Sequence, residues 1–357
     1  MSARLRVVLD QVVQVVDPDQ AAAALDLAHG LVATAPSGCS VEAIVPAGGD
    51  PSVDGLAATR TLGLARRELA ASWQLGIAPG VGGGMIHAPS LLAPLVRHDR
   101  LHDHDQTTVS LWCLDAWEAP ETMSKTSVAW HRAMLKRAVK HADAVVVPTH
   151  AIARRLAELS KLGDRIQVIA GAAPSGFAVP TDAVERRAAL SVPDRYIVVT
   201  GTGDALADGF RGAAASDAHA VVLDAAEGVE PAIADIAAAA GLPEQRAHVR
   251  GRLDDADRAA ILAGAAAYVA TSPLASWPWR ALEAMTLGVP VVAVDSGAHH
   301  DVIADGGMLV SATDLAEAVA EACEGSARRL SVLARDRSRA FSWAGSAERI
   351  WALHAEL

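Results

Sequence analysis

The second half of this 357-residue chain contains no lysine, since the four lysines are Lys125, Lys136, Lys140 and Lys161. Residues 1–180 hold 16 Lys and Arg against 17 Asp and Glu, whereas the remainder holds 15 against 25. A net charge of −11 argues against a nucleic-acid-binding protein. Any phosphate that binds to the second half must therefore be met by arginine or by backbone N–H groups.

Cysteines and long apolar runs are also scarce. Cys39, Cys113 and Cys323 have neither the density of a disulfide framework nor the spacing of a metal site. The apolar run near the N-terminus is cut by Asp10 and Gln11, which predicts a first strand rather than a signal peptide. No run approaches the roughly 20 apolar residues that a membrane helix needs. Free thiols without a signal peptide favour a cytoplasmic protein.

Short Val/Ile-rich runs alternate with longer Ala/Leu-rich stretches, a pattern typical of βα units around parallel sheets. The Gly- and Pro-rich residues 171–180 interrupt it and predict a boundary between two doubly wound units. We expect an N-terminal domain over residues 1–175, a C-terminal domain over 181–340 and a final amphipathic helix over 341–357. The expected strands are residues 5–9, 41–45, 85–88, 107–111, 144–147, 166–169, 196–200, 220–223, 247–250, 267–270, 291–294 and 308–310.

Two helix starts carry capping signals. Asp17 precedes Pro18, and Gln20 occupies the third helical position, as in a capping box. Thr149 is placed to cap the helix that follows the strand at residues 144–147.

Several polar patterns have a plain structural alternative. The glycines of residues 80–84 precede a strand, which is the wrong order for a dinucleotide-binding turn. The alternating His and Asp of residues 98–105 are metal-ligand types, but a solvated loop explains them equally well. Residues 125–141 predict a basic amphipathic helix, which either lies on an anionic membrane or presents a solvated face.

Residues 271–294, TSPLASWPWRALEAMTLGVPVVAV, predict a loop, a helix with Glu283, a tight turn at Gly288 and Pro290, and a buried strand. This segment resembles the nucleotide-sugar site of retaining glycosyltransferases of the GT-B fold, in sequence family 4, including actinobacterial mannosyltransferases. Further phrases similar to that family occur in the same order along almost the whole chain, at residues 87–90, 128–134, 142–149, 196–202, 248–253, 296–298 and 305–307.

The resemblance implies an α/β protein of the GT-B class, with two Rossmann-like domains facing across a cleft. The last helix, residues 341–357, would cross back to the N-terminal domain. It also implies transfer of a hexose such as mannose from a GDP- or UDP-hexose donor, with no bound cofactor and no catalytic metal. The acceptor would be a cell-envelope glycan or a lipid-linked sugar, at the inner face of the membrane where the helix at 125–141 makes peripheral contact.

By resemblance, Glu283 accepts hydrogen bonds from the ribose hydroxyls. A carboxylate suits two neighbouring hydroxyls because both of its oxygens are acceptors. A surface glutamate is the plainer interpretation. Arg280 would stabilise charge on the leaving diphosphate, unless it only pairs with a carboxylate. The remaining donor-side residues would be Gly201, Thr202, Arg211, Arg252, Ser276 and Trp277.

The N-terminal domain would contribute the acceptor side. His87 is an acceptor-side candidate because it lies at the end of a predicted strand. Asp115, after the strand at residues 107–111, is a further catalytic candidate. Trp112 stands where the family has a histidine that faces the sugar, and it either fills that space or only packs.

The donor side departs from the family pattern. Ala275 stands where the family has a first glutamate, and no cation occurs between Gly201 and Arg211, where the family has an arginine and a lysine. Pro278 removes one backbone donor from the loop before the helix. A non-catalytic GT-B protein that binds a glycan, a nucleotide or a partner glycosyltransferase is therefore the alternative function.

Overall fold

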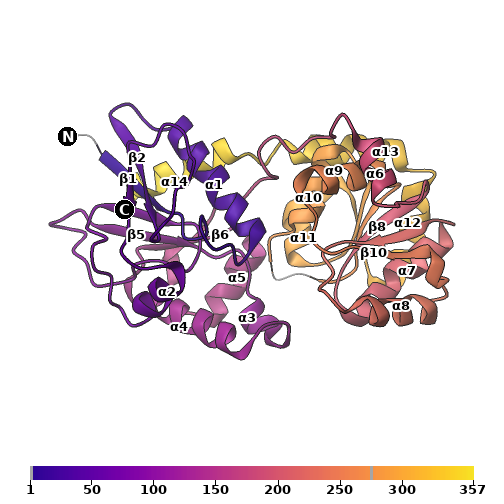
Figure 1. The fold of residues 1–357 in the computed structure, drawn as a ribbon, viewed down its shortest axis with the longest axis horizontal. Coiled ribbons are helices and arrows are strands. Elements are labelled where there is room, and N and C mark those ends of the chain that lie inside the picture. The colour runs from indigo at the N-terminus through magenta and orange to yellow at the C-terminus, as the bar shows by residue number, and fades with distance from the viewer. Residues whose placement is uncertain (1–2, 274–275) are drawn as a thin grey trace. The chain divides into compact units, whose positions relative to one another are not determined.

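The computed structural model describes residues 3–273 and 276–357, which form two compact units (Figure 1). Among these residues, unit 1 contains those up to Pro174, together with Ser276, Trp277 and residues 341–357. Unit 2 contains the remainder. Each unit is a parallel sheet with helices on both faces, as Figure 1 shows.

Unit 1 contains a seven-stranded sheet with the order β3-β2-β1-β4-β5-β6-β7, in which every strand pair is parallel. The inner strands β1, β4, β5 and β6 are largely buried, as parallel strands covered by helices must be, and β5 is buried although four of its five residues are polar. The strands are β1 (Ala3–Val8), β2 (Cys39–Val45), β3 (Ala58–Thr61), β4 (Met85–Ala88), β5 (Gln106–Ser110), β6 (Ala144–Val147) and β7 (Ile166–Val168).

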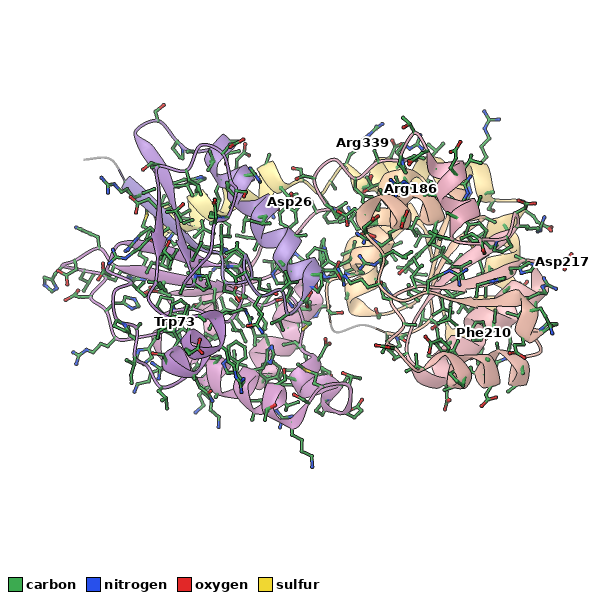
Figure 2. The ribbon with its side chains drawn as sticks, in the orientation of Figure 1. Asp26, Trp73, Arg186, Phe210, Asp217 and Arg339 are labelled. Carbon is green, nitrogen blue, oxygen red and sulfur yellow. The ribbon has the colours of Figure 1, made fainter. Side chains whose placement is uncertain are left out.

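The helices of unit 1 cover the two faces of this sheet. Helices α1 and α14 pack together on one face, while α2, α4 and α5 share a core with the other face (Figure 1). In Figure 2 the side chain of Trp73 lies inside this second layer. The helices are α1 (Pro18–Ala33), α2 (Arg66–Gln74), α3 (Asp115–Glu118), α4 (Lys125–His141), α5 (His150–Leu159) and α14 (Trp343–Glu356).

Unit 2 contains a six-stranded parallel sheet with the order β10-β9-β8-β11-β12-β13. The chain reverses direction across the sheet between β8 and β11, which is the topological switch point of this sheet. The strands are β8 (Tyr196–Thr200), β9 (His219–Val222), β10 (Ala247–Val249), β11 (Tyr268–Ala270), β12 (Val291–Val294) and β13 (Met308–Val310).

The helices of unit 2 form two layers with separate apolar cores. Phe210 of α7 is fully buried in one core (Figure 2), whereas Met285 of α10 is buried in the other. The exposed side chains of Asp217 and Arg339 point outward in the same view. The helices are α6 (Ala183–Ala189), α7 (Leu206–Ala215), α8 (Glu230–Ala239), α9 (Asp255–Gly264), α10 (Trp279–Leu287), α11 (Gly297–Ile303), α12 (Leu315–Cys323) and α13 (Ala327–Ser338).

Helix α14 returns the end of the chain to unit 1. Its apolar residues pack on α1, where a Cβ on Gly30 would lie 2.8 Å from the carbonyl oxygen of Trp343. The indole of Trp351 donates to the carbonyl of Leu31 at 3.1 Å, and Ser346 Oγ donates to the carbonyl of Ala170 at 2.6 Å. These bonds satisfy the polar atoms of the helix while its apolar face is buried.

The α/β fold class, with two Rossmann-like units and a returning last helix, is confirmed. The capping predictions also hold, because Asp17 accepts from the N–H of Gln20 and Thr149 accepts from that of Ile152, both at 3.1 Å. Gly288 ends α10 with a φ of +73°, which explains the glycine in the predicted turn. Strand β3 was missed because all four of its residues are exposed at the sheet edge and show no apolar pattern.

Candidate functional site

The turn after β8 lies at the carboxyl end of the second sheet and is joined to the loop after β11. A Cβ on Gly201 would overlap Thr271 Oγ1, and the backbone N–H of Thr202 donates to Ser272 Oγ at 3.0 Å. Both Gly201 and the exposed Thr202 therefore stand where a sheet of this topology binds ligands. The close approach leaves space for glycine alone at position 201.

The carboxylate of Glu283 is buried in the same unit and held by two arginines. Its side chain is 1% exposed. Arg258 of α9 donates to both carboxylate oxygens, at 2.8 and 2.9 Å, and Arg280 of α10 donates to Oε1 at 2.8 Å. The pKa of Arg258 lies above its ordinary value, because burial, which lowers it, is outweighed by the bonds to Glu283. Glu283 is thus fixed in one orientation by two guanidinium groups.

Asp224 joins this cluster from the end of β9. Its backbone has a φ of +59°, a left-handed conformation that aspartate tolerates better than most residues. Arg280 Nε donates to Asp224 Oδ2 at 2.7 Å, so the guanidinium of Arg280 links two carboxylates. Arg280 is 7% exposed. It therefore forms ion pairs here, and a phosphate group at this position would share it with Asp224.

The two other candidate cations of unit 2 are exposed. Arg211 lies on α7, where its guanidinium pairs with Asp208 one turn earlier. Arg252 lies in the loop between β10 and α9. Both side chains are accessible to a soluble anion, unlike Arg280.

Ser276 and Trp277 belong to unit 1, although they were predicted as donor-side residues. Ser276 forms a single antiparallel bridge with Cys113, and the N–H of Trp277 donates to the carbonyl of Trp112 at 3.0 Å. The buried indole of Trp277 meets the ring of Phe341 edge-on at 5.6 Å. Ala275, where the family has a first glutamate, lies outside the described residues.

Asp115 begins α3, just beyond the carboxyl end of β5 in unit 1. Burial raises its pKa and the carboxylate of Asp17 raises it further, while a hydrogen bond from Cys113 and the nearby His131 lower it. The net shift is upward, so Asp115 binds a proton more readily than an exposed aspartate. Trp112 is buried next to it, with its indole N–H bonded to the carbonyl of Pro89 at 2.8 Å.

His87 lies inside unit 1 and is fully buried. Its Nδ1 is 2.8 Å from Thr108 Oγ1, which in turn is 3.1 Å from Nε2 of His354 on α14. His354 Nδ1 is 2.8 Å from Gln106 Oε1. Burial, and then the neighbouring His354, lower the pKa of His87 to about 3. In this conformation His87 connects β4 and β5 to α14 and does not reach solvent.

Sequence reasoning missed a second polar cluster in unit 1, at the carboxyl end of β1. The buried carboxylate of Asp10 accepts from Arg66 Nε at 2.8 Å and from Ser90 Oγ at 3.2 Å. Burial raises the pKa of Asp10, although Arg66 opposes the shift. The available signal is the pair Asp10 and Gln11 directly after an apolar strand, because polar residues in that place lie at the carboxyl end of a sheet.

Arg258 and Asp224 were missed in unit 2. Arg258 sits within an acidic helix and looks like a surface residue, because its partner Glu283 is 25 positions away. Asp224 had a usable signal, since acidic residues at the end of the second strand commonly mark nucleotide sites in Rossmann-like units.

In the described part of the chain, no three His, Cys, Asp or Glu side chains are grouped to hold a metal ion. His98 pairs with Asp143, and His102 pairs with Asp99. A search of the described residues also finds no helix with the length and apolar character needed to span a bilayer.

Comparison with known proteins gives two findings. Residues 206–327, about a third of the chain and most of unit 2, match the family model of "Glycosyl transferases group 1". The whole chain is similar in structure to sucrose-phosphate synthase from Thermosynechococcus elongatus, with a TM-score of 0.69, 18% identity, and coverage of 99% of this chain and 98% of that one. The fold is GT-B.

Two further GT-B neighbours agree. HepE from Anabaena, solved in complex with UDP and glucose, has a TM-score of 0.67 and 16% identity over 99% of this chain and 100% of its own. The N-terminal domain of Candida albicans trehalose-6-phosphate phosphatase has a TM-score of 0.65 and 13% identity, over 99% of this chain and 98% of its own. No curated protein matches the chain significantly. At these identities the neighbours establish the fold alone.

Proposed function

We propose that this protein is a retaining glycosyltransferase that moves a hexose, mannose among the candidates, from a GDP- or UDP-hexose donor. The observation that carries the proposal is the buried carboxylate of Glu283, held by Arg258 and Arg280 in the segment that matches the glycosyltransferase model. HepE, a neighbour over the full chain, was solved with UDP and glucose. A nucleotide sugar is therefore the ligand class that we expect.

On the donor side, the ribose hydroxyls bind Glu283, with Asp224 and Arg280 completing the charged cluster. The Gly201 turn approaches the diphosphate, with the backbone N–H of Thr202 nearby. Arg211 and Arg252 are the accessible cations proposed to stabilise negative charge on the leaving diphosphate, and Arg280 would contribute from its place between Asp224 and Glu283.

On the acceptor side, Asp115 is the proposed polar contact, and His87 and Trp112 pack inside the same unit. The proposed acceptor is a cell-envelope glycan or a lipid-linked sugar, reached from the cytoplasm, with helix α4 touching an anionic membrane. Met134, Leu135 and Ala138 are buried, whereas Arg132, Lys136 and Lys140 of α4 are exposed, which supports this placement.

The first experiment is calorimetry of the full chain with UDP-glucose and GDP-mannose. We expect micromolar binding of one donor, weakened about tenfold or more when a cation that contacts phosphate is removed, which corresponds to about 1.4 kcal/mol. Comparing Arg280→Ala, Arg211→Ala and Arg252→Ala identifies that cation. Glu283→Gln tests the ribose contact, and Glu185→Gln, on the exposed face of α6, is the matched control.

The second experiment is sugar transfer to membrane extracts, with the anomeric configuration of the product read by proton NMR. A product with the donor's configuration supports the retaining mechanism. No binding of any nucleotide sugar to folded protein contradicts the donor site. Binding without transfer contradicts the transferase and leaves the non-catalytic alternative.

A further inference from the structure

Unit 1 contains a cavity of about 530 Å³ at the amino ends of its strands. Arg97 and Arg100 lie in the loop before β5, Asp143 directly precedes β6, and Arg165 directly precedes β7. Ligands of open parallel sheets normally bind at the carboxyl ends of the strands. The cavity is therefore at the opposite edge of the sheet from Asp10 and Asp115, and it is independent of the proposed transferase site.

The walls of this cavity carry an excess of positive charge. The cationic side chains that line it are Arg97, Arg100, Lys140 and Arg165, whereas the side-chain carboxylates that line it are Asp143 and Asp164. Among the described residues, the side chains of Arg97, Arg100 and Lys140 take part in no hydrogen bond or ion pair. In a chain of net charge −11, four cations around one cavity form a local reversal of sign.

Arg165 is fixed without being neutralised. Its Nε, Nη1 and Nη2 donate to the carbonyls of Leu162, Ala142 and Val139 at 3.3, 2.7 and 2.8 Å. A guanidinium has five N–H donors, so two remain after these three bonds. The partners are neutral, and the full positive charge is held in a set orientation toward the cavity that it lines.

His98 pairs with one of the two carboxylates. Its Nε2 is 2.8 Å from Asp143 Oδ2, and that hydrogen bond, more than any other contact, raises the pKa of His98. Asp143 Oδ2 also accepts the N–H of Thr107 at 2.7 Å. Asp164, the other carboxylate, is exposed.

The pKa of His141 is lowered, first by burial and then by the positive charges of Arg137, Lys140 and His98. Arg137 and Lys140 therefore place positive charge beside this imidazole at the end of α4. The positive charge thus comes from both the loop before β5 and the end of α4.

We propose that this cavity binds the phosphate group of a small phosphorylated compound, as a second anion site of the protein. Arginine recognises phosphate oxygens through charge-assisted, often bidentate hydrogen bonds, and lysine adds a point charge. The cavity volume lies within the ordinary range of ligand pockets, so it has room for more than inorganic phosphate. Leu353 and Leu357 supply an apolar wall for the remainder of the ligand.

The test uses inorganic phosphate and the full chain, with binding followed by calorimetry. Arg100→Ala combined with Lys140→Ala removes two exposed cations whose side chains form no hydrogen bond or ion pair among the described residues, so we expect folding to be preserved. We expect phosphate affinity to fall about tenfold or more in this double variant, or about 1.4 kcal/mol. Arg154→Ala, an exposed arginine of α5 outside the cavity, is the matched control and leaves the affinity unchanged.

A second arm separates the two sources of a phosphate group. Co-sedimentation with phosphatidylglycerol vesicles, against phosphatidylcholine vesicles, detects a lipid headgroup. Vesicle binding or free-phosphate binding that is lost in the double variant supports the site and names its source. Binding that survives in the double variant but disappears in Arg280→Ala assigns the anion to unit 2 and overturns the proposal. So does the absence of binding to both probes.

Discussion

Units 1 and 2 have the same parallel-sheet architecture, but the buried polar network that joins α14 to the sheet in unit 1 is neutral, whereas the buried cluster around Glu283 in unit 2 consists of ion pairs. Unit 1 keeps His87 and His354 neutral in its interior, with pKa values lowered to about 3 and about 4, and joins them through Thr108. Unit 2 buries the ions of Arg258 and Glu283 and compensates each with the other. Both arrangements avoid an unpaired buried charge, which is among the most costly features a protein interior can contain.

The difference shows what each polar group can do. A neutral histidine network holds α14 against the sheet and gains nothing from being ionised. A fixed ion cluster at the end of a sheet stores charge in a defined orientation, which is what recognition of a polar ligand requires. The contrast supports the proposal that the donor binds to unit 2. The buried polar network of unit 1 instead holds α14 against its sheet.

The largest effect is expected from Arg258→Met, which removes the bidentate partner of Glu283 while keeping most of the side-chain volume. Leaving a buried carboxylate short of its partner costs about 3–5 kcal/mol. Hydrogen exchange measured peptide by peptide should show faster exchange in β11 and β12 and little change in unit 1. Arg186→Met is the control, because its ion pairs with Asp182 and Asp257 lie at the surface and should leave exchange unchanged.

The next effect is a loss of stability of unit 1 in acid. The folded pKa values of His87 and His354 lie below the ordinary 6.5, so the unfolded chain binds more protons between about pH 6.5 and 3. The contribution of these two histidines to the free energy of unfolding is fully present above pH 6.5 and decreases as the pH falls through this window. Each unit of pKa difference is worth about 1.4 kcal/mol.

His354→Gln removes one of these protonation sites and keeps a neutral hydrogen-bonding side chain. We expect its stability to depend less steeply on pH between 6.5 and 4. Tryptophan fluorescence reports unit 1, because seven of the eight tryptophans lie there. His102→Gln, at an exposed residue, should reproduce the parent profile. An identical slope for His354→Gln and the parent would contradict the buried neutral histidine.

A moderate effect is expected where α14 meets α1. A Cβ on Gly30 would approach the Trp343 carbonyl to 2.8 Å, and both atoms belong to packed helices. Gly30→Ala should therefore destabilise unit 1 by about 1–3 kcal/mol, as overpacked positions do. Gly63→Ala, where a Cβ meets nothing within 4 Å, is the control for denaturant unfolding. Equal midpoints for both variants would show that α14 shifts easily on α1.

The smallest effect should be the same in the two units. Thr149 caps α5 in unit 1 and Ser296 caps α11 in unit 2, each through its side-chain oxygen. Replacement of either by Ala should cost about 1 kcal/mol, because each loses one cap bond. Local hydrogen exchange at the first turn of each helix measures the loss. Strongly unequal costs would mean that a cap contributes to more than its own helix.

Much of the fold could be predicted because it depends on local pattern. Apolar runs located twelve of the thirteen strands in the described part of the chain, and capping residues located the starts of α1 and α5. The exception, β3, lies on the sheet edge, where no buried face imposes a pattern. The site was less accessible to prediction. Glu283 could be selected by its position before Gly288, but Asp10 and Arg66 gave no local signal of their pairing.

The sequence by itself determined the parallel α/β units, the helix caps and the turn at Gly288, because these depend on neighbours within a few residues. Only the tertiary structure decided which charges meet. Glu283 finds Arg258 25 positions away, and His354 reaches Thr108 from 246 positions away. Strand order and helix packing bring such residues together, and those depend on burial across the whole unit rather than on any local period.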